Sequence, residues 1–344
     1  MLYPALFLKN PRASLLLVAL LMVNIAAWGW ALFSFGHSSS LMAASLLAWC
    51  YGLRHAVDAD HIAAIDNVTR KMMQQGNAPC SIGTWFSLGH SSIVVLATIA
   101  IAATATAFSH QIGWFHETGG VIGTIVSAVF LIAMAMINLV ILSGVWRSFR
   151  RLKKGQAIHS EGESLATGGM MNWIFGKAFN LVSQSWHMYL VGFLFGLGFD
   201  TATEIGVLGI SAAGASHGME VWSILIFPAL FTSAMALIDT LDNIIMVEAY
   251  GWAFSKPQRK LYYNLTVTGT SVIVALFIGG SEALGLLVDK LHLHGGLWDT
   301  IGLLNDNLGN AGFFVIGLFV ACWLLSMLNY KWKGYDRLVI EGGQ

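Results

Sequence analysis

The chain has 344 residues, of which 56% are hydrophobic and only 10% are charged, and its mean hydropathy is +0.68. A soluble domain carries about a quarter charged residues, so this chain has too few polar side chains to cover a surface in water. The net charge is zero and no basic patch is present, which argues against nucleic acid as a partner. We therefore expect an all-α, polytopic membrane protein in contact with lipid.

Eight apolar stretches are long enough to cross a bilayer, which takes about 20 residues of helix. The first follows Lys9 and Arg12 and is too long for the core of a cleaved signal peptide, so we interpret it as an uncleaved first helix. The second is the longest and is interrupted by charged residues. The stretches run over residues 14–33, 41–69, 82–107, 119–146, 188–213, 222–248, 267–289 and 310–330.

The basic residues lie almost entirely on one side of this topology. Of the 18 Lys and Arg residues, 16 fall in the termini and the even-numbered loops, one (Lys290) in the other loops, and one (Arg54) inside a stretch. Basic loops stay in the cytoplasm, so both termini are predicted to be cytoplasmic and the protein to lie in the inner membrane. The longest loop, 147–187, divides a single membrane domain, 1–344, into four-helix halves, 1–146 and 188–344.

Ionisable residues inside the predicted helices are the strongest functional signal, because a charge at the bilayer centre costs about 2.5–3.5 kcal/mol. Here they are imidazoles and carboxylates, which suit transition-metal ions such as Ni²⁺. We therefore predict a metal site. Its candidate ligands are His55, Asp58, Asp60 and His61 in the second stretch, His90 in the third, Asp200 and Glu204 in the fifth, and Asp239 and Asp242 in the sixth.

The spacing in the second stretch leaves two arrangements open. On an unbroken helix His55 and His61 are roughly 9 Å apart along the axis, so one ion cannot readily bind both. Either the helix is locally unwound, as transporter helices are near substrate, or other helices complete two stacked sites. Asp58 can share a site with either histidine, or form a structural ion pair with Arg54. Asp60 would then be an acceptor that fixes the tautomer of an imidazole.

A weak internal repeat suggests two inverted halves. Gly52-Leu53 precedes Asp58 in the second stretch, and Gly196-Leu197 precedes Asp200 in the fifth, which runs in the opposite direction. Inverted halves that meet at a midplane site are a common plan among secondary transporters.

At these residues the chain resembles the nickel/cobalt transporter family, and within it the bacterial high-affinity nickel permeases. That family is marked by H-x4-D-H, which here is His55, four residues, Asp60 and His61. Its other motifs are similar to Leu88–Ser91, Gly196–Glu204 and Asp239–Asp242, so the resemblance covers nearly the whole chain.

The resemblance implies uptake of Ni²⁺ or Co²⁺ as a transported substrate, with no resident cofactor, to supply nickel enzymes. The sequence departs from the family pattern at Asn243, where Gly is expected, and this residue could bear on the choice of metal.

Two other functions compete with metal uptake. An efflux carrier would share the same residues, since sequence polarity does not set the direction of transport. A membrane-embedded metalloenzyme is disfavoured, because the chain has neither repeated His boxes nor the H-E-x-x-H motif, so we predict that it is not an enzyme. The sequence does not indicate an oligomeric state.

Overall fold

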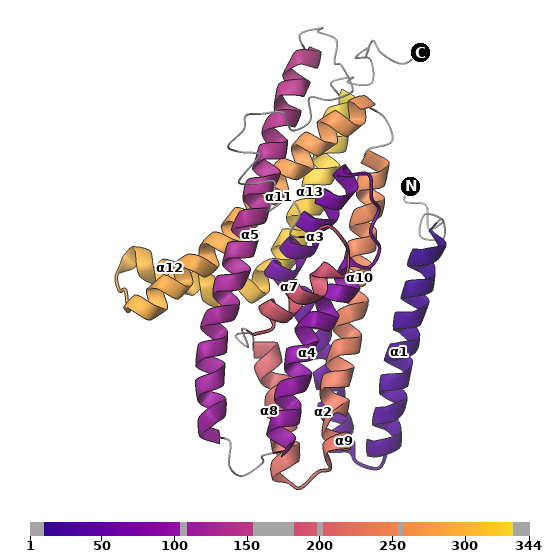
Figure 1. Cartoon of the computed structure of the whole chain (residues 1–344), viewed down its shortest axis with the longest axis vertical. Coiled ribbons are helices and arrows are strands. Elements are labelled where there is room, and N and C mark those ends of the chain that lie inside the picture. The colour runs from indigo at the N-terminus through magenta and orange to yellow at the C-terminus, as the bar shows by residue number, and fades with distance from the viewer. Residues whose placement is uncertain (1–9, 104–108, 154–181, 198–201, 254–256, 333–344) are drawn as a thin grey trace.

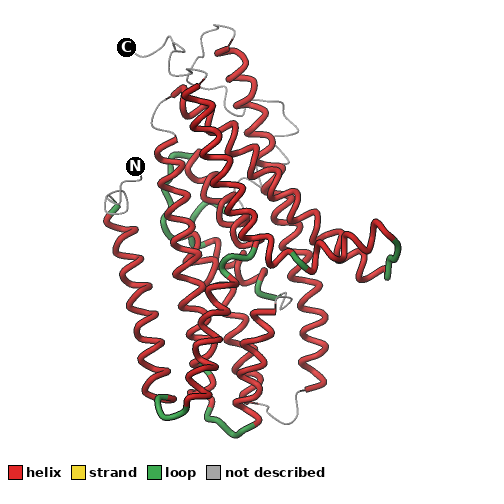
Figure 2. The backbone as a smooth tube through the Cα atoms, turned by 180° about the vertical axis from the view of Figure 1, so that it is seen from behind, coloured by secondary structure: helices red, strands yellow, loops and turns green. Residues whose placement is uncertain are grey.

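The computed structural model describes residues 10–103, 109–153, 182–197, 202–253 and 257–332. All regular secondary structure in these ranges is helical (Figure 2), which confirms the predicted all-α class. The helices are α1 (Pro11–Phe35), α2 (Ser39–His55), α3 (Ala59–Gln74), α4 (Ile82–Ala103), α5 (Ser109–Lys153), α7 (His187–Phe195), α8 (Ala202–Ser216), α9 (Val221–Ile224), α10 (Ile226–Ala253), α11 (Pro257–Leu291), α12 (Gly296–Asp306) and α13 (Leu308–Trp332).

Six helical segments in the described part of the chain are long and apolar enough to cross a membrane, and each matches a predicted stretch. The second and fifth stretches are instead each divided into two shorter helices, α2 with α3 and α7 with α8, so eight continuous spans are not confirmed. The six segments are Pro11–Phe35, Ile82–Ala103, Val121–Gly144, Val221–Gly251, Leu265–Leu291 and Ala311–Asn329.

Helix α10 lies inside the bundle and contacts α1, α2, α3 and α4 (Figure 1). On the other side of the molecule α5 packs along α11, and α3 is enclosed by α5, α10, α11 and α13. The short helix α12 projects sideways from the bundle (Figure 1). The sequence did not predict α12, because its 11 residues are too few to cross a bilayer.

At the break between α2 and α3, one side chain has alternative partners. Asp58 occupies the N-cap position of α3 with extended backbone, but its carboxylate makes no capping bond. It binds Arg54 and His55 instead. Such an Asp normally accepts a bond from the first turn and stabilises the helix start by about 1 kcal/mol. Because Arg54 and His55 bind this carboxylate, the first turn of α3 lacks the capping hydrogen bond that an Asp at this position normally makes.

Two glycines allow other helices to approach the break and its surroundings. A Cβ at Gly312 of α13 would lie 1.5 Å from the carbonyl oxygen of Val57, inside the break. A Cβ at Gly83 of α4 would lie 2.1 Å from the carbonyl oxygen of Asp239 in α10. Neither contact leaves room for a side chain, so both helices come close only because these residues are glycine.

Helix α3 is buried along almost its whole length, from Ala59 to Met72, although it carries several charged residues. A helix that is buried all round but polar cannot face lipid, because its charges need protein partners. This explains why hydropathy alone places the second stretch poorly: only its first half, α2, has partly exposed apolar residues such as Leu46 and Leu47.

Candidate metal site

Three buried histidines from three helices meet beside the α2–α3 break. His55 is the last residue of α2, His61 lies in the first turn of α3, and His90 lies in α4. One ring nitrogen from each falls within 4.8 Å of the others, and the ring centroids are 4.6–4.9 Å apart. The break removes the separation of roughly 9 Å that a continuous helix would impose. Of the two arrangements that the spacing left open, the structure therefore has the unwound helix.

The closest pair of nitrogens has a separation that fits a hydrogen bond between the two rings and equally fits two ligands on one ion. Nε2 of His55 lies 2.8 Å from Nε2 of His90. Two imidazole nitrogens bound at about 2.0–2.1 Å and at a right angle would be about 2.8–3.0 Å apart. Square-planar or octahedral coordination contains such right angles, and tetragonal N and O sites are typical of Ni²⁺ and Cu²⁺.

Each imidazole contacts a carboxylate from a different part of the chain. Oδ2 of Asp58 lies 3.0 Å from Nδ1 of His55. Oδ2 of Asp239 in α10 lies 3.3 Å from Nδ1 of His61. Oε1 of Glu204 in the first turn of α8 lies 2.9 Å from Nε2 of His90. The contacts at Nδ1 of His55 and of His61 lie opposite Nε2 and are of the kind that fixes the tautomer and orientation of a metal-binding imidazole, whereas Glu204 contacts the same nitrogen of His90 that faces His55.

These contacts determine which nitrogens are available to an ion. With Nδ1 of His55 and of His61 turned to a carboxylate, their Nε2 atoms carry the lone pairs. Nε2 of His61 is buried and has no hydrogen-bond partner among the described residues. Nε2 of His90 faces both His55 and Glu204, and it can donate a proton to only one of them. A metal ion would replace that proton.

Two hydroxyl groups also belong to the site, and neither was predicted from the sequence. Oγ1 of Thr203 lies 3.1 Å from Nδ1 of His55. Ser87 donates to Oδ2 of Asp239 at 2.6 Å and so holds the carboxylate that contacts His61. The available signal was position: Thr203 directly precedes Glu204, and Ser87 lies one helical turn before His90.

The charges around the imidazoles suit a divalent cation. When ionised, the three carboxylates that contact the histidines carry three negative charges, and Arg54 offsets one through its ion pair with Asp58. That pair was one of the predicted interpretations of Asp58 and is confirmed. A dication would neutralise the remaining charge, whereas an empty site leaves it buried at a cost.

The other predicted site residues have different positions. Asp60 does not fix an imidazole tautomer as expected: its Oδ1 accepts from the backbone N–H of His61, because it lies on the first turn of α3 with its carboxylate directed at the helix start. Asp242 lies one turn beyond Asp239 on α10, and its buried Oδ2 has no hydrogen-bond partner in the described part of the chain. Asp200 lies outside the described residues.

Aromatic rings close the site on several sides. The ring of Phe231 lies 5.5 Å from that of His55, and the ring of Phe86 lies 4.7 Å from that of His61. His55, His61 and His90 expose 2%, 0% and 3% of their surface. An ion held here would be cut off from bulk water.

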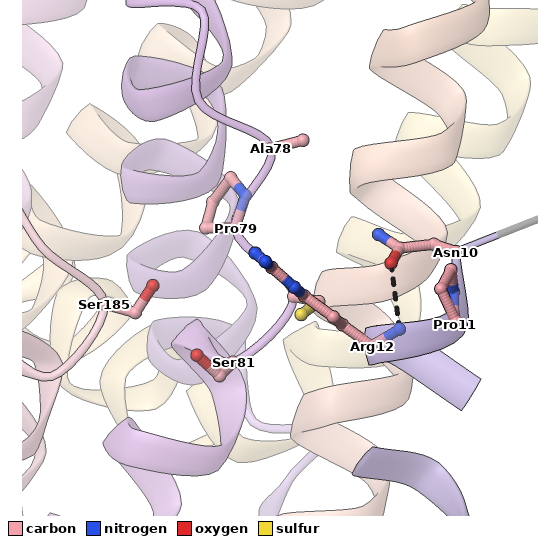
Figure 3. A pocket seen from close by; sticks show the side chains of 8 residues that line it. Asn10, Pro11, Arg12, Ala78, Pro79, Ser81 and Ser185 are labelled. Carbon is pink, nitrogen blue, oxygen red and sulfur yellow. Dashed lines mark hydrogen bonds between the residues drawn. The ribbon is translucent and has the colours of Figure 1, made fainter. Parts of the chain in front are cut away.

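A separate cavity of about 510 Å³ lies near the start of α1 and α4 (Figure 3). Its lining includes Arg12, Ser81 and Ser185 together with the thiol of Cys80, but no histidine or carboxylate. It therefore lacks the donors that the histidine cluster offers to a transition metal.

Comparison with known proteins agrees with the chemistry of the cluster. A family model described as high-affinity nickel-transport protein matches residues 41–329. A high-affinity nickel transport protein of Cupriavidus necator is 53% identical over 331 residues, covering 95% of this chain and 94% of the relative. The chain belongs to the high-affinity nickel-transport protein family. The resemblance found in the sequence motifs is thus confirmed.

Other members of the nickel-transport family carry names for two metals. The nickel transporter NixA of Staphylococcus aureus is 40% identical over 326 residues, covering 94% of this chain and 96% of the relative. The cobalt transport protein NhlF of Rhodococcus rhodochrous is 36% identical over 295 residues, covering 85% and 83%. These relatives are named as transporters and not as enzymes. No solved structure matches the chain.

Proposed function

We propose that this protein takes up Ni²⁺, with Co²⁺ as a second substrate, across the cytoplasmic membrane, and that the ion binds among His55, His61 and His90. The observation that carries the proposal is the meeting of three buried imidazoles from three helices, with ring nitrogens within 4.8 Å, in a member of a nickel-transport family. Asp58, Asp239 and Glu204 orient these imidazoles or join them as ligands. Asp200, in the same motif as Glu204, is proposed to add a further carboxylate.

Both broken helices supply groups to the site, which supports a role for the breaks in transport. His55 and His61 flank the α2–α3 break, and Thr203 and Glu204 lie at the start of α8. We infer that each broken pair crosses the membrane once, which gives eight crossings with both termini in the cytoplasm. In this arrangement the halves 1–146 and 188–344 each contribute one interrupted crossing, as expected for inverted halves.

The membrane potential favours uptake over efflux. Moving one charge through 100 mV is worth about 2.3 kcal/mol, so a dication gains about 4.6 kcal/mol on entering a negative interior. Efflux by the same site would need a larger opposing driving force.

The test is uptake of ⁶³Ni²⁺ by cells that express the protein, with Co²⁺, Zn²⁺ and Mn²⁺ as competitors. We expect Co²⁺ to compete best.

The site itself is tested by substitution. His55→Ala, His61→Ala and His90→Ala are expected to reduce uptake to the background of cells without the protein, while membrane insertion persists. The matched control is His217→Ala, an exposed histidine at the end of α8 that bonds to Ala213, and it should transport normally. Full uptake by any of the three cluster variants would refute the site, and metal loss from preloaded cells would indicate efflux.

A further inference from the structure

A second buried polar cluster lies further along α3, beyond His61. It consists of Asp66, Arg70 and Tyr250, called here the inner cluster. Arg70 forms an ion pair with Oδ2 of Asp66, and the Tyr250 hydroxyl donates to Oδ1 of the same carboxylate. The guanidinium also lies 5.9 Å from the centre of the Tyr250 ring. The three residues expose 0%, 1% and 3% of their surface, so their charges are enclosed by protein.

The same two helices carry the metal site and the inner cluster. His61 of α3 faces Asp239 of α10, and further along both helices Asp66 faces Tyr250. Asp242 lies between these levels on α10, within electrostatic reach of both Asp239 and Asp66. Helices α3 and α10 end toward the loops that carry the basic residues, which is the predicted cytoplasmic side. A cation that leaves the histidines toward the cytoplasm along α3 and α10 therefore meets the inner cluster.

The inner cluster is an obstacle to a cation in its present form. A buried guanidinium repels a dication, and both oxygens of Asp66 are taken by Arg70 and Tyr250. As a stabilising device the pair would be a poor choice, because apolar residues of similar volume often stabilise a protein as well as a buried ion pair does. Nε and Nη1 of Arg70 have no hydrogen-bond partner among the described residues, so the guanidinium is incompletely satisfied.

We propose that the inner cluster closes the ion pathway on its cytoplasmic side. The guanidinium of Arg70 occupies the carboxylate of Asp66, which a departing ion would otherwise bind. This proposal rests on the proposed function and extends it. When the guanidinium leaves Asp66, the carboxylate becomes a ligand for the departing ion together with Asp242. When the ion has left, Arg70 returns and closes the route. Arg70 and Asp66 are thus residues that control transport without touching the ion while it is bound at the histidines.

The closure can be tested by labelling a cysteine just inside it. In a protein with Cys50, Cys80 and Cys322 changed to Ser, Thr69→Cys places a thiol at a fully buried position next to Arg70, where the native hydroxyl accepts from Asn243. The measurement is the rate of labelling by a membrane-impermeant maleimide in everted vesicles. Arg70→Gln should label about tenfold faster, which corresponds to roughly 1.4 kcal/mol in the opening equilibrium. Arg70→Lys keeps the charge and should return the rate to within about threefold of the parent.

The matched control is Lys71→Gln at the adjacent buried residue, whose Nζ donates to the backbone carbonyl of Val182. It should label at the parent rate. Labelling of Arg70→Gln at the parent rate would overturn the proposal, and so would equal acceleration in Lys71→Gln. If Arg70→Gln fails to fold, Tyr250→Phe takes its place, with an expected acceleration of about threefold, and a parent rate there overturns the proposal.

Equilibrium binding of ⁶³Ni²⁺ to each purified variant is measured in parallel. Loss of binding in the parent would refute the proposed function, whereas the labelling rates would still decide the closure.

Discussion

At the scale of single residues, the three imidazoles are held by carboxylates that the chain draws from distant positions. Asp58 is three residues from His55, whereas Asp239 is 178 residues from His61 and Glu204 is 114 residues from His90. Only the first of these contacts follows from local spacing. The candidate residues can be identified from the sequence because a charge inside a membrane helix is costly. Which carboxylate contacts which histidine depends on how α8 and α10 pack.

The pairing predicts that two neighbouring acidic residues differ in importance for metal binding. Asp239→Asn removes the charge that orients His61, and substitutions of this kind typically weaken metal affinity about 10–100-fold. Asp60→Asn leaves the imidazole contact intact and should weaken affinity by less than about threefold. The measurement is the Kd for Ni²⁺ of the purified variants. Equal losses in the two variants would instead support a tautomer-fixing role for Asp60.

Imidazole ligation also predicts how binding depends on pH. A ligating imidazole must be neutral, and its unperturbed pKa is about 6.5, so protons compete with the metal at lower pH. Ni²⁺ affinity of the purified protein should therefore fall as pH drops below about 6.5, and binding should release protons into a weakly buffered solution. Measuring binding instead of uptake separates this effect from any coupling of transport to protons. An affinity that stays flat from pH 5 to 8 would contradict imidazole ligation.

At the scale of elements, the break in the second stretch depends on a neighbour as well as on its own sequence. Val57 lies in the break, and its carbonyl oxygen faces Gly312 of α13 without space for a side chain. Helix α13 thus packs directly against the interrupted backbone beside the metal site. A residue more than 250 positions away in sequence is part of the support of the break.

This contact predicts a large difference between two glycines of the same helix. In Gly312→Ala the added methyl group collides with backbone, which cannot rotate away as a side chain can, and the cost should be about 1–3 kcal/mol or more. In Gly317→Ala the methyl group meets nothing within 4 Å, and Ala favours a helix over Gly by up to about 1 kcal/mol. Thermal unfolding in detergent and ⁶³Ni²⁺ uptake should both be impaired in the first variant. In the second, uptake should be unchanged and the unfolding temperature unchanged or slightly raised. Indistinguishable variants would show that α13 does not support the break.

The helices that the sequence predicts well are those that are long and apolar enough to face lipid. Apolar length identified α1, α4 and α13, because a helix that faces hydrocarbon must be apolar over about 20 residues. It failed for α3, whose charged residues are enclosed by other helices, and for α12, which is too short. The ends of α2 and α3 were not located either, because the predicted Arg54–Asp58 ion pair joins residues that are also neighbours on an unbroken helix.

At the scale of the whole molecule, the buried cluster and the basic loops define a direction. The histidines lie where two apolar clusters meet, one that includes Ala56 and Phe231 and another that includes Ala59 and Phe86. Between the histidines and the basic loops lies the polar inner cluster, whereas His55 itself contacts Asp58, Thr203 and the apolar ring of Phe231. In the proposed orientation, the inner cluster is on the side toward which the ion would leave.

This direction requires that the α3–α4 connection and the α11–α12 connection lie on opposite sides of the membrane. Cys80 belongs to the first connection and lines the cavity near the start of α1 and α4, and His294 is exposed in the second. With Cys50 and Cys322 changed to Ser, we expect a membrane-impermeant maleimide to label Cys80 in everted vesicles but not in intact spheroplasts. In a protein without native cysteines, His294→Cys should show the reverse, and both thiols should react once the membrane is permeabilised. Labelling of both from one face would exclude eight crossings, because the two connections are separated by an odd number of them. Exchange of the two faces would keep the fold but place both termini outside, and the inner cluster would then close the external side.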